Sequence, residues 1–319
     1  MPLYLVLTVA TVALAPVWLP LAALADAVTG RARVMPRTRA LTFLAVYLLC
    51  ETAAMPLCAV VWLRYVGGRV GGADGFLEAN AALQRWFTGT LFSACLRVFA
   101  MRVEADGLDV ARPAPFVLLV RHASTADTVL AAAFVANPSK TVLRYVLKRE
   151  LLWDPALDVV GRRLRNAFVD RSGSRTGAEV AAIAGLAKNL DDRSGVLIYP
   201  EGTRYSPRKH ADAVAKLRAK GRDDLAALAA NFRSVLPPRP AGTLALLDAA
   251  PGVDVLVLEH AGFEGAATLP SLWGGALVGR TLRVRLRRIP AAEIPAAGRE
   301  AWLFAQWAET DRWVTAARG

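Results

Sequence analysis

Two long apolar runs open the chain. Residues 3–25 carry no charged side chain, and residues 40–63 carry only Glu51. Each run is long enough to cross a bilayer, because about 20 apolar residues suffice. Pro16 and Pro20 would kink or shorten a helix in the first run. We therefore expect two apolar, membrane-associated helices.

Residues 67–101 separate this N-terminal segment (residues 1–66) from the rest of the chain. They open with Gly67-Gly68-Arg69-Val70-Gly71-Gly72, a stretch typical of a flexible linker. The remainder shows an apolar helical pattern that Arg85 and Arg97 interrupt. We expect an amphipathic helix here, lying on the following domain or on the membrane surface and not spanning the bilayer.

Residues 102–319 change to short apolar strands that alternate with helical patterns. The clearest helical pattern is Ala178 to Leu190. Such alternation predicts an α/β domain with a mostly parallel central sheet flanked by helices. Reactive side chains then belong at the carboxyl ends of the strands. The predicted strands are residues 115–120, 142–147, 167–169, 196–199, 253–258 and 282–286.

The composition narrows the class of partner. The net charge of +12 suggests a polyanion, either nucleic acid or an anionic membrane face. The two apolar runs favour the membrane, and no nucleic-acid motif or interleaved aromatic and basic stripe occurs. Cys50, Cys58 and Cys95 lie in apolar stretches with no C-x-x-C pair, so we expect neither a disulfide framework nor a zinc site.

One histidine follows a predicted strand. His122 comes just after residues 115–120, and Asp127 stands five residues later. A carboxylate about one helical turn away fixes the tautomer of the imidazole and supports the imidazolium that forms in a reaction. We therefore expect His122 to be a general base and Asp127 its orienting partner. Simple packing of His122 at a strand end is the alternative for an isolated motif of this length.

Three further blocks accompany this one, in order. The four blocks are His122-x4-Asp127, Phe168-Val169-Asp170-Arg171, Pro200-Glu201-Gly202-Thr203-Arg204 and Leu236-Pro237-Pro238-Arg239-Pro240. One block alone is weak, but four in order are a strong signal. On these blocks the chain resembles the glycerolipid acyltransferase family, which includes 1-acylglycerol-3-phosphate acyltransferase. Residues 148–155 and 236–242 resemble the branch that contains lysocardiolipin and related lysophospholipid acyltransferases.

The resemblance implies a reaction and its partners. A fatty acyl chain would pass from acyl-CoA or acyl carrier protein to the free hydroxyl of a membrane lysophospholipid. The simplest acceptor is 1-acylglycerol-3-phosphate, which gives phosphatidic acid. The acceptor hydroxyl takes the part of the nucleophile, so no protein nucleophile is required. We expect no metal and no cofactor. A neutral or different lyso-lipid acceptor stays open, as do the acyl donor, the chain length and the oligomeric state.

The resemblance also implies binding residues. Arg171 and Arg204 would bind the acceptor phosphate, which suits a planar guanidinium. Glu201 would organise its loop, and Gly202 would let the backbone approach a ligand. The predicted substrate-binding residues are Lys148, Arg171, Glu201, Gly202, Thr203 and Arg204, with Pro237 and Pro238 on the acyl-donor side. The alternatives are an ordinary charged turn for the loop, an ion pair between Arg171 and Asp170, and a simply exposed Lys148.

Two positions depart from the family pattern. Arg121 replaces the Asn that often precedes the histidine, and it could bind a phosphate or alter the choice of acceptor. Tyr199 replaces a Phe, which is a mild change. His210 and His260 have no ligand-spaced partner, and we expect both to be structural. A non-catalytic membrane scaffold that retains the fold is the rival function, and the intact residues His122, Asp127, Glu201 and Arg204 argue against it.

The topology poses a conflict between two rules. Arg31, Arg33, Arg37 and Arg39 in the connector favour its placement on the cytoplasmic side. Two complete spans would then put the catalytic domain on the other side, away from cytosolic acyl donors. Glu51 in mid-segment would also cost roughly 2.5–3.5 kcal/mol at the bilayer centre. We therefore expect a hairpin in one leaflet of a cell or organelle membrane, with the catalytic domain facing the cytoplasm.

Overall fold

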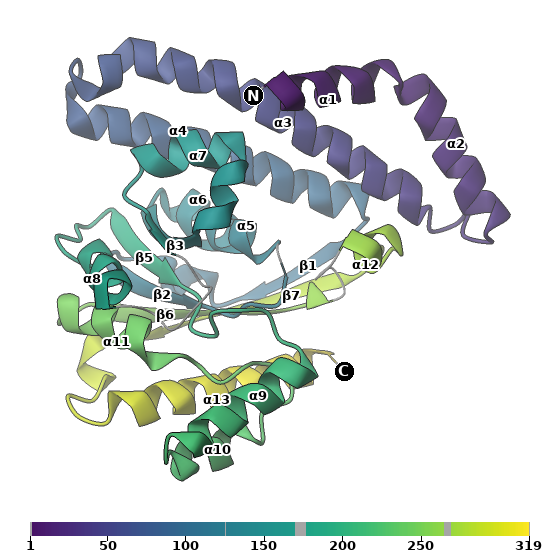
Figure 1. Ribbon diagram of the computed structural model, residues 1–319. Helices are drawn as coiled ribbons and strands as arrows, with labels where there is room; N and C mark the ends of the chain where they lie inside the picture. The colour runs from purple at the N-terminus through teal and green to yellow at the C-terminus, as the bar shows by residue number, and fades with distance from the viewer. Residues whose placement is uncertain (1, 125, 170–176, 265–268, 319) are drawn as a thin grey trace.

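The computed structural model describes residues 2–124, 126–169, 177–264 and 269–318, and it shows an α/β fold with both faces of the sheet covered (Figure 1). The sheet is seven-stranded in the order β1-β7-β6-β2-β5-β3-β4. Strand β7 runs antiparallel to β6, and the other neighbouring strands pair in parallel. The strands are β1 (Arg102–Asp106), β2 (Phe116–Val120), β3 (Val142–Lys148), β4 (Ala167–Val169), β5 (Ser194–Ile198), β6 (Asp254–Ala261) and β7 (Thr281–Ile289).

Six of these strands overlap the strands expected from the sequence, and the mostly parallel sheet is confirmed. Strand β1 was not predicted. Its five residues Arg-Val-Glu-Ala-Asp are all exposed at the edge of the sheet, so it has no apolar run to reveal it. Strands β6 and β7 extend beyond their predicted ends because they pair with each other over seven positions.

The central strand β2 shows why both faces must be covered. All five of its residues are buried. Phe116, Leu118 and Val120 pack into one core with helices α4 and α5, and Val117 and Leu119 pack into a second core on the opposite face. Alternate side chains of a strand point to opposite faces, so a strand that is apolar at every position requires helices on each side.

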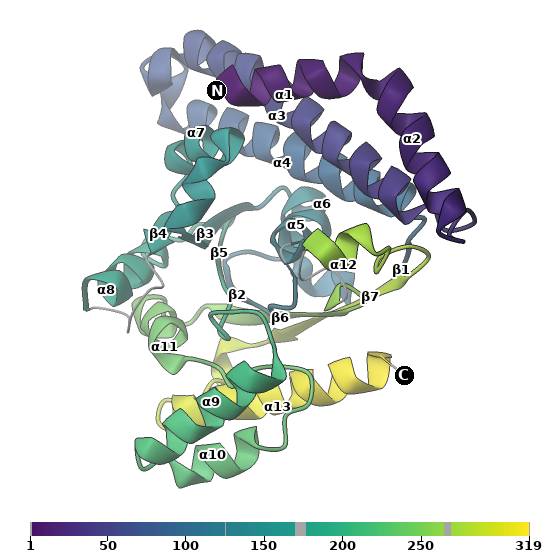
Figure 2. The ribbon, with the colours of Figure 1, turned by 45° about the vertical axis from the view of Figure 1, so that its right-hand side comes forward.

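The helices form the two outer layers (Figures 1 and 2). On one side lie α4 (Gly72–Val98), α5 (Asp127–Ala131), η3 (Ala132–Ala136), α6 (Asn137–Ser139) and α7 (Pro155–Arg163), with η4 (Arg149–Trp153) leading into α7. On the other lie α8 (Gly177–Leu186), α9 (Pro207–Ala219), α10 (Asp223–Ala229), α11 (Pro240–Ala249) and α13 (Arg299–Arg318). Three short segments lie in connections: η2 (Leu108–Ala111) between β1 and β2, α12 (Leu269–Trp273) between β6 and β7, and η6 (Ala291–Glu293) between β7 and α13.

The first apolar run forms two helices. Helices α1 (Pro2–Ala13) and α2 (Ala15–Val28) meet at a bend of 70°. Pro16 lies in the first turn of α2, where its missing N–H costs no intrahelical hydrogen bond. Trp18 Nε1 donates to the Thr11 carbonyl across the bend at 2.7 Å. The break next to Pro16 thus divides the run, whereas Pro20 lies inside α2 and does not interrupt it.

The second apolar run forms one helix, α3 (Pro36–Tyr65), which lies against the α/β domain through contacts near both of its ends. Arg39 donates to the Val98 carbonyl at the end of α4. Near the other end, Arg163 of α7 donates to the Cys58 carbonyl at 2.8 Å. A turn with η1 (Val66–Gly68) and left-handed Gly71 then returns the chain into α4, which lies antiparallel to α3 and between it and the sheet (Figure 1).

Glu51 is buried against the catalytic domain and does not face outward from α3. Its Oε2 accepts from the Ala156 N–H at the start of α7 at 3.1 Å. Cys50, Cys58 and Cys95 are buried and free. The interior position of Glu51 explains how a carboxyl group is accommodated in an otherwise apolar helix.

Candidate active site

The two predicted catalytic residues, His122 and Asp127, lie at the carboxyl edge of the sheet. His122 follows β2 after one residue, and Asp127 is the first residue of α5. Their side chains meet: His122 Nδ1 lies 3.2 Å from Asp127 Oδ2. The histidine side chain is 14% exposed and the aspartate side chain is fully buried, so only the histidine can reach a substrate.

The chain between the two residues wraps around the carboxylate. Asp127 Oδ2 accepts from the backbone N–H of Ala123 at 2.5 Å and of Ser124 at 2.7 Å. The Ser124 hydroxyl accepts from the Ala126 N–H at 3.2 Å, just before α5 begins. These short-range bonds fix the carboxylate, which holds Nδ1 of His122 as a donor and leaves Nε2 as the atom able to take a proton. The five-residue spacing therefore brings the imidazole and the carboxylate together, in an arrangement that is able to act as a base.

Glu201 supports the histidine from the neighbouring strand. The residue follows β5 after two positions and is buried. Its Oε1 accepts from the His122 N–H and its Oε2 from the Leu236 N–H, both at 2.8 Å. Burial raises the pKa of Glu201 to about 8, against the opposing influence of these N–H groups and of Arg121. One carboxyl group thus joins three segments that are distant in the sequence.

Tyr199 and Gly202, on either side of Glu201, complete the surroundings of His122 and of the turn. The rings of Tyr199 and His122 lie 4.7 Å apart between centroids and are tilted by 38°. Gly202 has a φ of +70°, and a Cβ there would lie 3.1 Å from Cδ of Arg239. A glycine satisfies both the left-handed turn and the close approach of the arginine stem.

Basic side chains collect beside this turn. Lys209, on the first turns of α9, donates from Nζ to the Thr203 hydroxyl at 3.0 Å and to the Arg204 carbonyl at 3.3 Å. The pKa of Lys209 is lowered by partial burial, and further by the positive charges of Arg204, Lys148 and Arg239. Lys209 and three further cations therefore lie close enough to interact beside the turn that follows Glu201, an arrangement suited to an anion.

Lys209 and Arg239 were not among the predicted binding residues. Arg239 lies within the fourth block, but the sequence analysis assigned no binding function to it, and Lys209 lies outside all four blocks. Arg171 belongs to the predicted set but lies outside the described residues.

The fourth block, residues 236–240, stabilises the loop that contains Glu201. Pro237 and Pro238 are buried, and the Arg239 N–H donates to the Pro200 carbonyl at 2.8 Å. Upstream, Asp311 of α13 accepts from the N–H groups of residues 233–235. The block thus holds the Glu201 loop in place, and the acyl-donor contact of its two prolines stays a prediction.

Arg121 does not face the substrate side, which corrects the expectation that it could bind a phosphate. Its side chain is 1% exposed. The guanidinium donates to the His260 carbonyl, to the Glu264 carboxylate and, at 3.0 Å, to the Ser234 carbonyl. Burial alone would raise the pKa of Glu264, but Arg121 and Arg318 hold it at about 2. Arg121 therefore connects the end of β2 to residues near the end of β6 and to Ser234 through buried hydrogen bonds.

His260, which the sequence analysis expected to be structural only, lies next to the catalytic pair. It lies on β6, 138 positions from His122, and is completely buried. Its Nε2 lies 3.4 Å from Asp127 Oδ1, on the far side of the carboxylate from His122. No spacing rule connects these residues, because β6 reaches the site only by pairing in register with β2.

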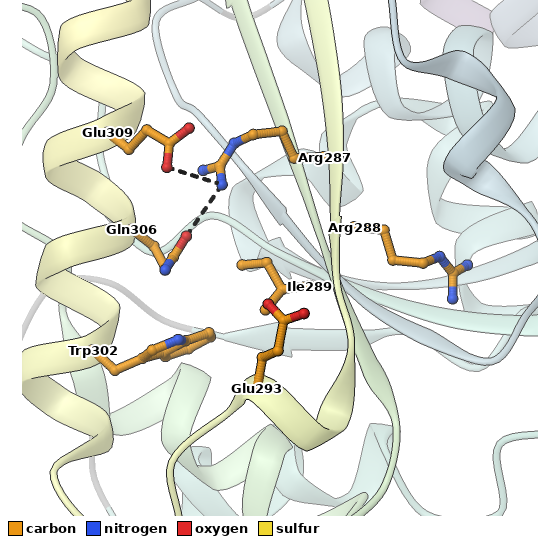
Figure 3. Close-up of a pocket in the computed structure, with 7 residues that line it drawn as sticks. All are labelled: Arg287, Arg288, Ile289, Glu293, Trp302, Gln306 and Glu309. Carbon is orange, nitrogen blue, oxygen red and sulfur yellow. Dashed lines mark hydrogen bonds and ion pairs between the residues drawn. The ribbon is translucent and has the colours of Figure 1, made fainter.

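A polar hollow of about 580 Å³ lies elsewhere, between β7 and α13 (Figure 3). Arg287 points toward Gln306 and Glu309 there, at 3.2 and 3.3 Å. Residues 287–289 pair with residues 255–257 at the start of β6, which is the edge of the sheet opposite His122. This hollow takes no part in the arrangement around the histidine. Among the described residues, no group of three His, Cys, Asp or Glu side chains could hold a metal ion.

Comparisons with known proteins agree on one family. The Acyltransferase family model matches residues 102–238. A 1-acyl-sn-glycerol-3-phosphate acyltransferase of Pseudomonas aeruginosa is 36% identical over 111 residues, which cover 34% of this chain and 39% of that relative. The crystal structure of the 1-acyl-sn-glycerophosphate (LPA) acyltransferase PlsC from Thermotoga maritima matches with a TM-score of 0.57 and 16% identity, covering 88% of this chain and 97% of that one. At 16% identity, the structural match shows a shared fold.

Proposed function

Because this chain belongs to the glycerolipid acyltransferase family, we propose that it transfers a fatty acyl chain to the free hydroxyl of a lysophospholipid. The proposed acceptor is 1-acylglycerol-3-phosphate, the product is phosphatidic acid, and the donor is acyl-CoA or acyl carrier protein. The observation that carries the proposal is His122, partly exposed and fixed by buried Asp127, beside a cluster of cations.

The proposed step begins at the acceptor hydroxyl. Nε2 of His122 removes its proton as the oxygen attacks the thioester carbonyl carbon. The C–S bond then breaks, and the thiolate leaves with the proton that the imidazolium returns. Asp127 supports the imidazolium between these two proton transfers. Positioned general-base catalysis supplies about 10²- to 10⁴-fold, so the rest of the acceleration falls to binding and orientation of both substrates.

The cation cluster is the proposed site of the acceptor phosphate. Lys148, Arg204, Lys209 and Arg239 lie near one another at the carboxyl edge of the sheet, next to the base. A phosphate relieves the repulsion that lowers the pKa of Lys209 and also binds a guanidinium in a bidentate manner. Arg171 is proposed for the same site from the family resemblance alone. We propose Glu201 as a positioning residue, since both of its oxygens accept backbone N–H groups.

We also propose that the N-terminal helices form a hairpin in one leaflet. Helix α3 is long and apolar enough to span by length and composition, and so is the α1–α2 pair if it is counted as one span. At about 1.5 Å per residue, however, the 12 residues of α1 and the 14 of α2 each fall short of a hydrocarbon core of about 30 Å. Helix α3 contacts the catalytic domain from Arg39 to Cys58, so a spanning α3 would draw charged groups of α7 into the bilayer.

The proposed contact with lipid is the outward face of these helices. Its exposed apolar side chains include Leu3, Leu5, Val6, Leu7, Val9, Val12, Val17, Leu21, Leu24, Leu44, Leu57, Val60, Trp62 and Leu63. Of the four connector arginines, Arg31 and Arg33 are exposed and available to head groups. Arg37 instead donates to the Thr29 hydroxyl at 2.7 Å and to the Ala25 carbonyl at 2.9 Å, so it stabilises the connector itself.

An activity assay tests the enzymatic proposal. The purified full chain in detergent is given 1-acylglycerol-3-phosphate with acyl-CoA or with acyl-acyl carrier protein, and phosphatidic acid is measured by mass spectrometry. We expect product with wild type and almost none with His122→Ala, while His210→Ala serves as the matched control. Folded protein that acylates no lysophospholipid would favour the scaffold instead.

Cysteine labelling in intact cells tests the hairpin. The three native cysteines are buried, so single cysteines introduced at Arg33 and Lys220, both exposed, report cleanly. A hairpin leaves Arg33→Cys and Lys220→Cys accessible from the same, cytoplasmic side. Labelling of the two positions from opposite sides would mean that α3 spans the membrane and would contradict the proposed access to a cytosolic donor.

A further inference from the structure

We propose that His260 is a positioning residue of the active site, which holds Asp127 from behind so that its carboxylate is aimed at His122. This inference rests on the proposed function, since it concerns the same base. It extends the catalytic pair to a line of three side chains, His122, Asp127 and His260. The last of them touches neither substrate.

The geometry divides the two oxygens of Asp127 between the two histidines. Oδ2 faces His122 Nδ1 at 3.2 Å and also receives two backbone N–H groups. Oδ1 receives no hydrogen bond within the described chain and is buried, and its facing donor is His260 Nε2 at 3.4 Å. That same Nε2 lies 3.1 Å from the Arg121 carbonyl. The Nε2–H therefore donates to the Arg121 carbonyl and lies 3.4 Å from the carboxylate without forming a hydrogen bond to it.

The protonation of His260 follows from its surroundings. Burial is the largest influence on its pKa and lowers it; Asp127 and Glu264 act in the opposite direction, and Arg121 reinforces the lowering. The ring is therefore neutral and carries one proton. Nδ1 is buried with no hydrogen-bond partner in the described chain, whereas Nε2 faces two acceptors. A buried unpaired donor costs more than a well-placed one, so the proton resides on Nε2.

A neutral N–H at Oδ1 has two consequences for His122. Its partial positive charge favours the rotation of the carboxylate that keeps Oδ1 toward His260 and Oδ2 toward His122. It also withdraws part of the negative charge that would otherwise stabilise the imidazolium. The groups that face His122 are Asp127 from α5, Glu201 from the end of β5 and the Tyr199 ring. Of these, only the aspartate bonds to a ring nitrogen in the described chain, so a change at His260 reaches the base through it.

The test compares His260→Leu with His260→Gln. Leucine removes the donor, whereas glutamine can place an amide N–H where ring Nε2 lies. We expect His260→Leu to lower kcat about tenfold or more, with the KM of the acceptor changed less than about twofold. The acid limb of its kcat/KM profile should move to higher pH, because the carboxylate then favours the imidazolium more strongly. His260→Gln should restore most of the kcat and most of the wild-type pH profile.

Thr310→Val is the control for simple destabilisation. The buried Thr310 hydroxyl donates to Glu259 Oε1 at 2.9 Å, next to His260 on β6. Its loss should lower the melting temperature without moving the pH profile. If His260→Leu also lowers only the melting temperature and leaves kcat and the pH profile as in wild type, His260 is merely structural and the inference is wrong. The same conclusion holds if His260→Gln fails to restore the profile while it folds as stably as wild type.

A second readout separates this inference from the proposed function. Diethyl pyrocarbonate modifies neutral imidazole, and mass spectrometry of the His122 peptide gives the rate at each pH without any turnover. His122 is partly exposed and His260 is buried, so the reagent distinguishes them. Displacement of this profile by His260→Leu, in a protein that acylates nothing, would support the positioning of His122 and reject the acyltransferase. If His260→Leu leaves the profile unchanged in a protein that is active, the acyltransferase proposal stands and the positioning by His260 is rejected.

Discussion

Two groups of cations in this molecule have opposite surroundings. On β7, Arg283, Arg285, Arg287 and Arg288 each pair with carboxylates, among them Glu104, Glu259, Glu309 and Asp254. Near His122, Lys209 is surrounded instead by Arg204, Lys148 and Arg239. Within the described residues, Lys148, Lys209 and Arg239 form no ion pair. The arginines on β7 are neutralised and hold the strand to its neighbours. The cations around Lys209 repel one another, which lowers stability. A protein that keeps such a cluster has a site suited to an anion.

The largest expected effect concerns the base beside those cations. His122→Ala should lower kcat by about 10²- to 10⁴-fold, because the ring acts mainly in the transition state. Circular dichroism and acceptor binding should stay as in wild type. A kcat near that of wild type would place the chemistry elsewhere.

Asp127→Asn should come next. The amide cannot support the imidazolium, and it favours the wrong tautomer of His122. If its oxygen takes the place of Oδ2, toward His122 Nδ1 and the two backbone N–H groups, its NH₂ group lies toward Nε2 of buried His260 instead. We expect severe loss of kcat together with a lower melting temperature, measured by steady-state kinetics and calorimetry. An active, stable Asn variant would contradict the orienting function.

The comparison of the two cation groups is sharpened by matched arginine deletions. Arg204→Ala and Arg239→Ala should weaken use of a phosphate-bearing acceptor by about 1.5–3 kcal/mol relative to a neutral lyso-lipid, the usual value of a charge-assisted bond. Arg287→Ala, on β7, should lower the stability of the protein and change kcat/KM for the two acceptors equally. Equal losses on both acceptors at Arg204 and Arg239 would make these two residues structural as well.

Lys209→Met should show the same discrimination with a smaller loss. The lysine is an exposed point charge without the fork of a guanidinium. Its removal relieves repulsion in the unliganded protein, so we expect a slightly higher melting temperature without phosphate. The difference between kcat/KM values for charged and neutral acceptors is the measurement. An unchanged ratio would exclude the lysine from the site.

A separate effect, on stability and not on turnover, is the pH dependence that Glu201 contributes. Burial raises its folded pKa to about 8 from an unfolded value of 4.5. The protonated form is thus favoured in the folded state, and its contribution is complete below pH 4.5 and is lost as the pH rises to about 8. The unfolding free energy of wild type should fall through this range relative to Glu201→Gln, whose side chain does not titrate. Parallel curves from urea denaturation would contradict the shift.

The sequence by itself determined whatever depends on near neighbours. The all-apolar β2 required a sheet covered on both faces, and Pro16 divided the first apolar run at a bend. The His122–Asp127 pair also follows from sequence, because the intervening backbone N–H groups and the start of α5 bring the carboxylate to the ring. Such contacts span a few residues, so periodicity and motif spacing are sufficient to find them.

Only the tertiary structure decided the rest. Edge strand β1 has no apolar pattern, and its position depends on pairing with β7. Arg121 turned inward because carbonyls at 234 and 260 and the Glu264 carboxylate converge there. Glu51 found a partner on α7, and His260 reached Asp127 through the register of β6 with β2. In each case the partner is distant in the chain, and only the folded sheet and its layers bring the two groups within bonding distance.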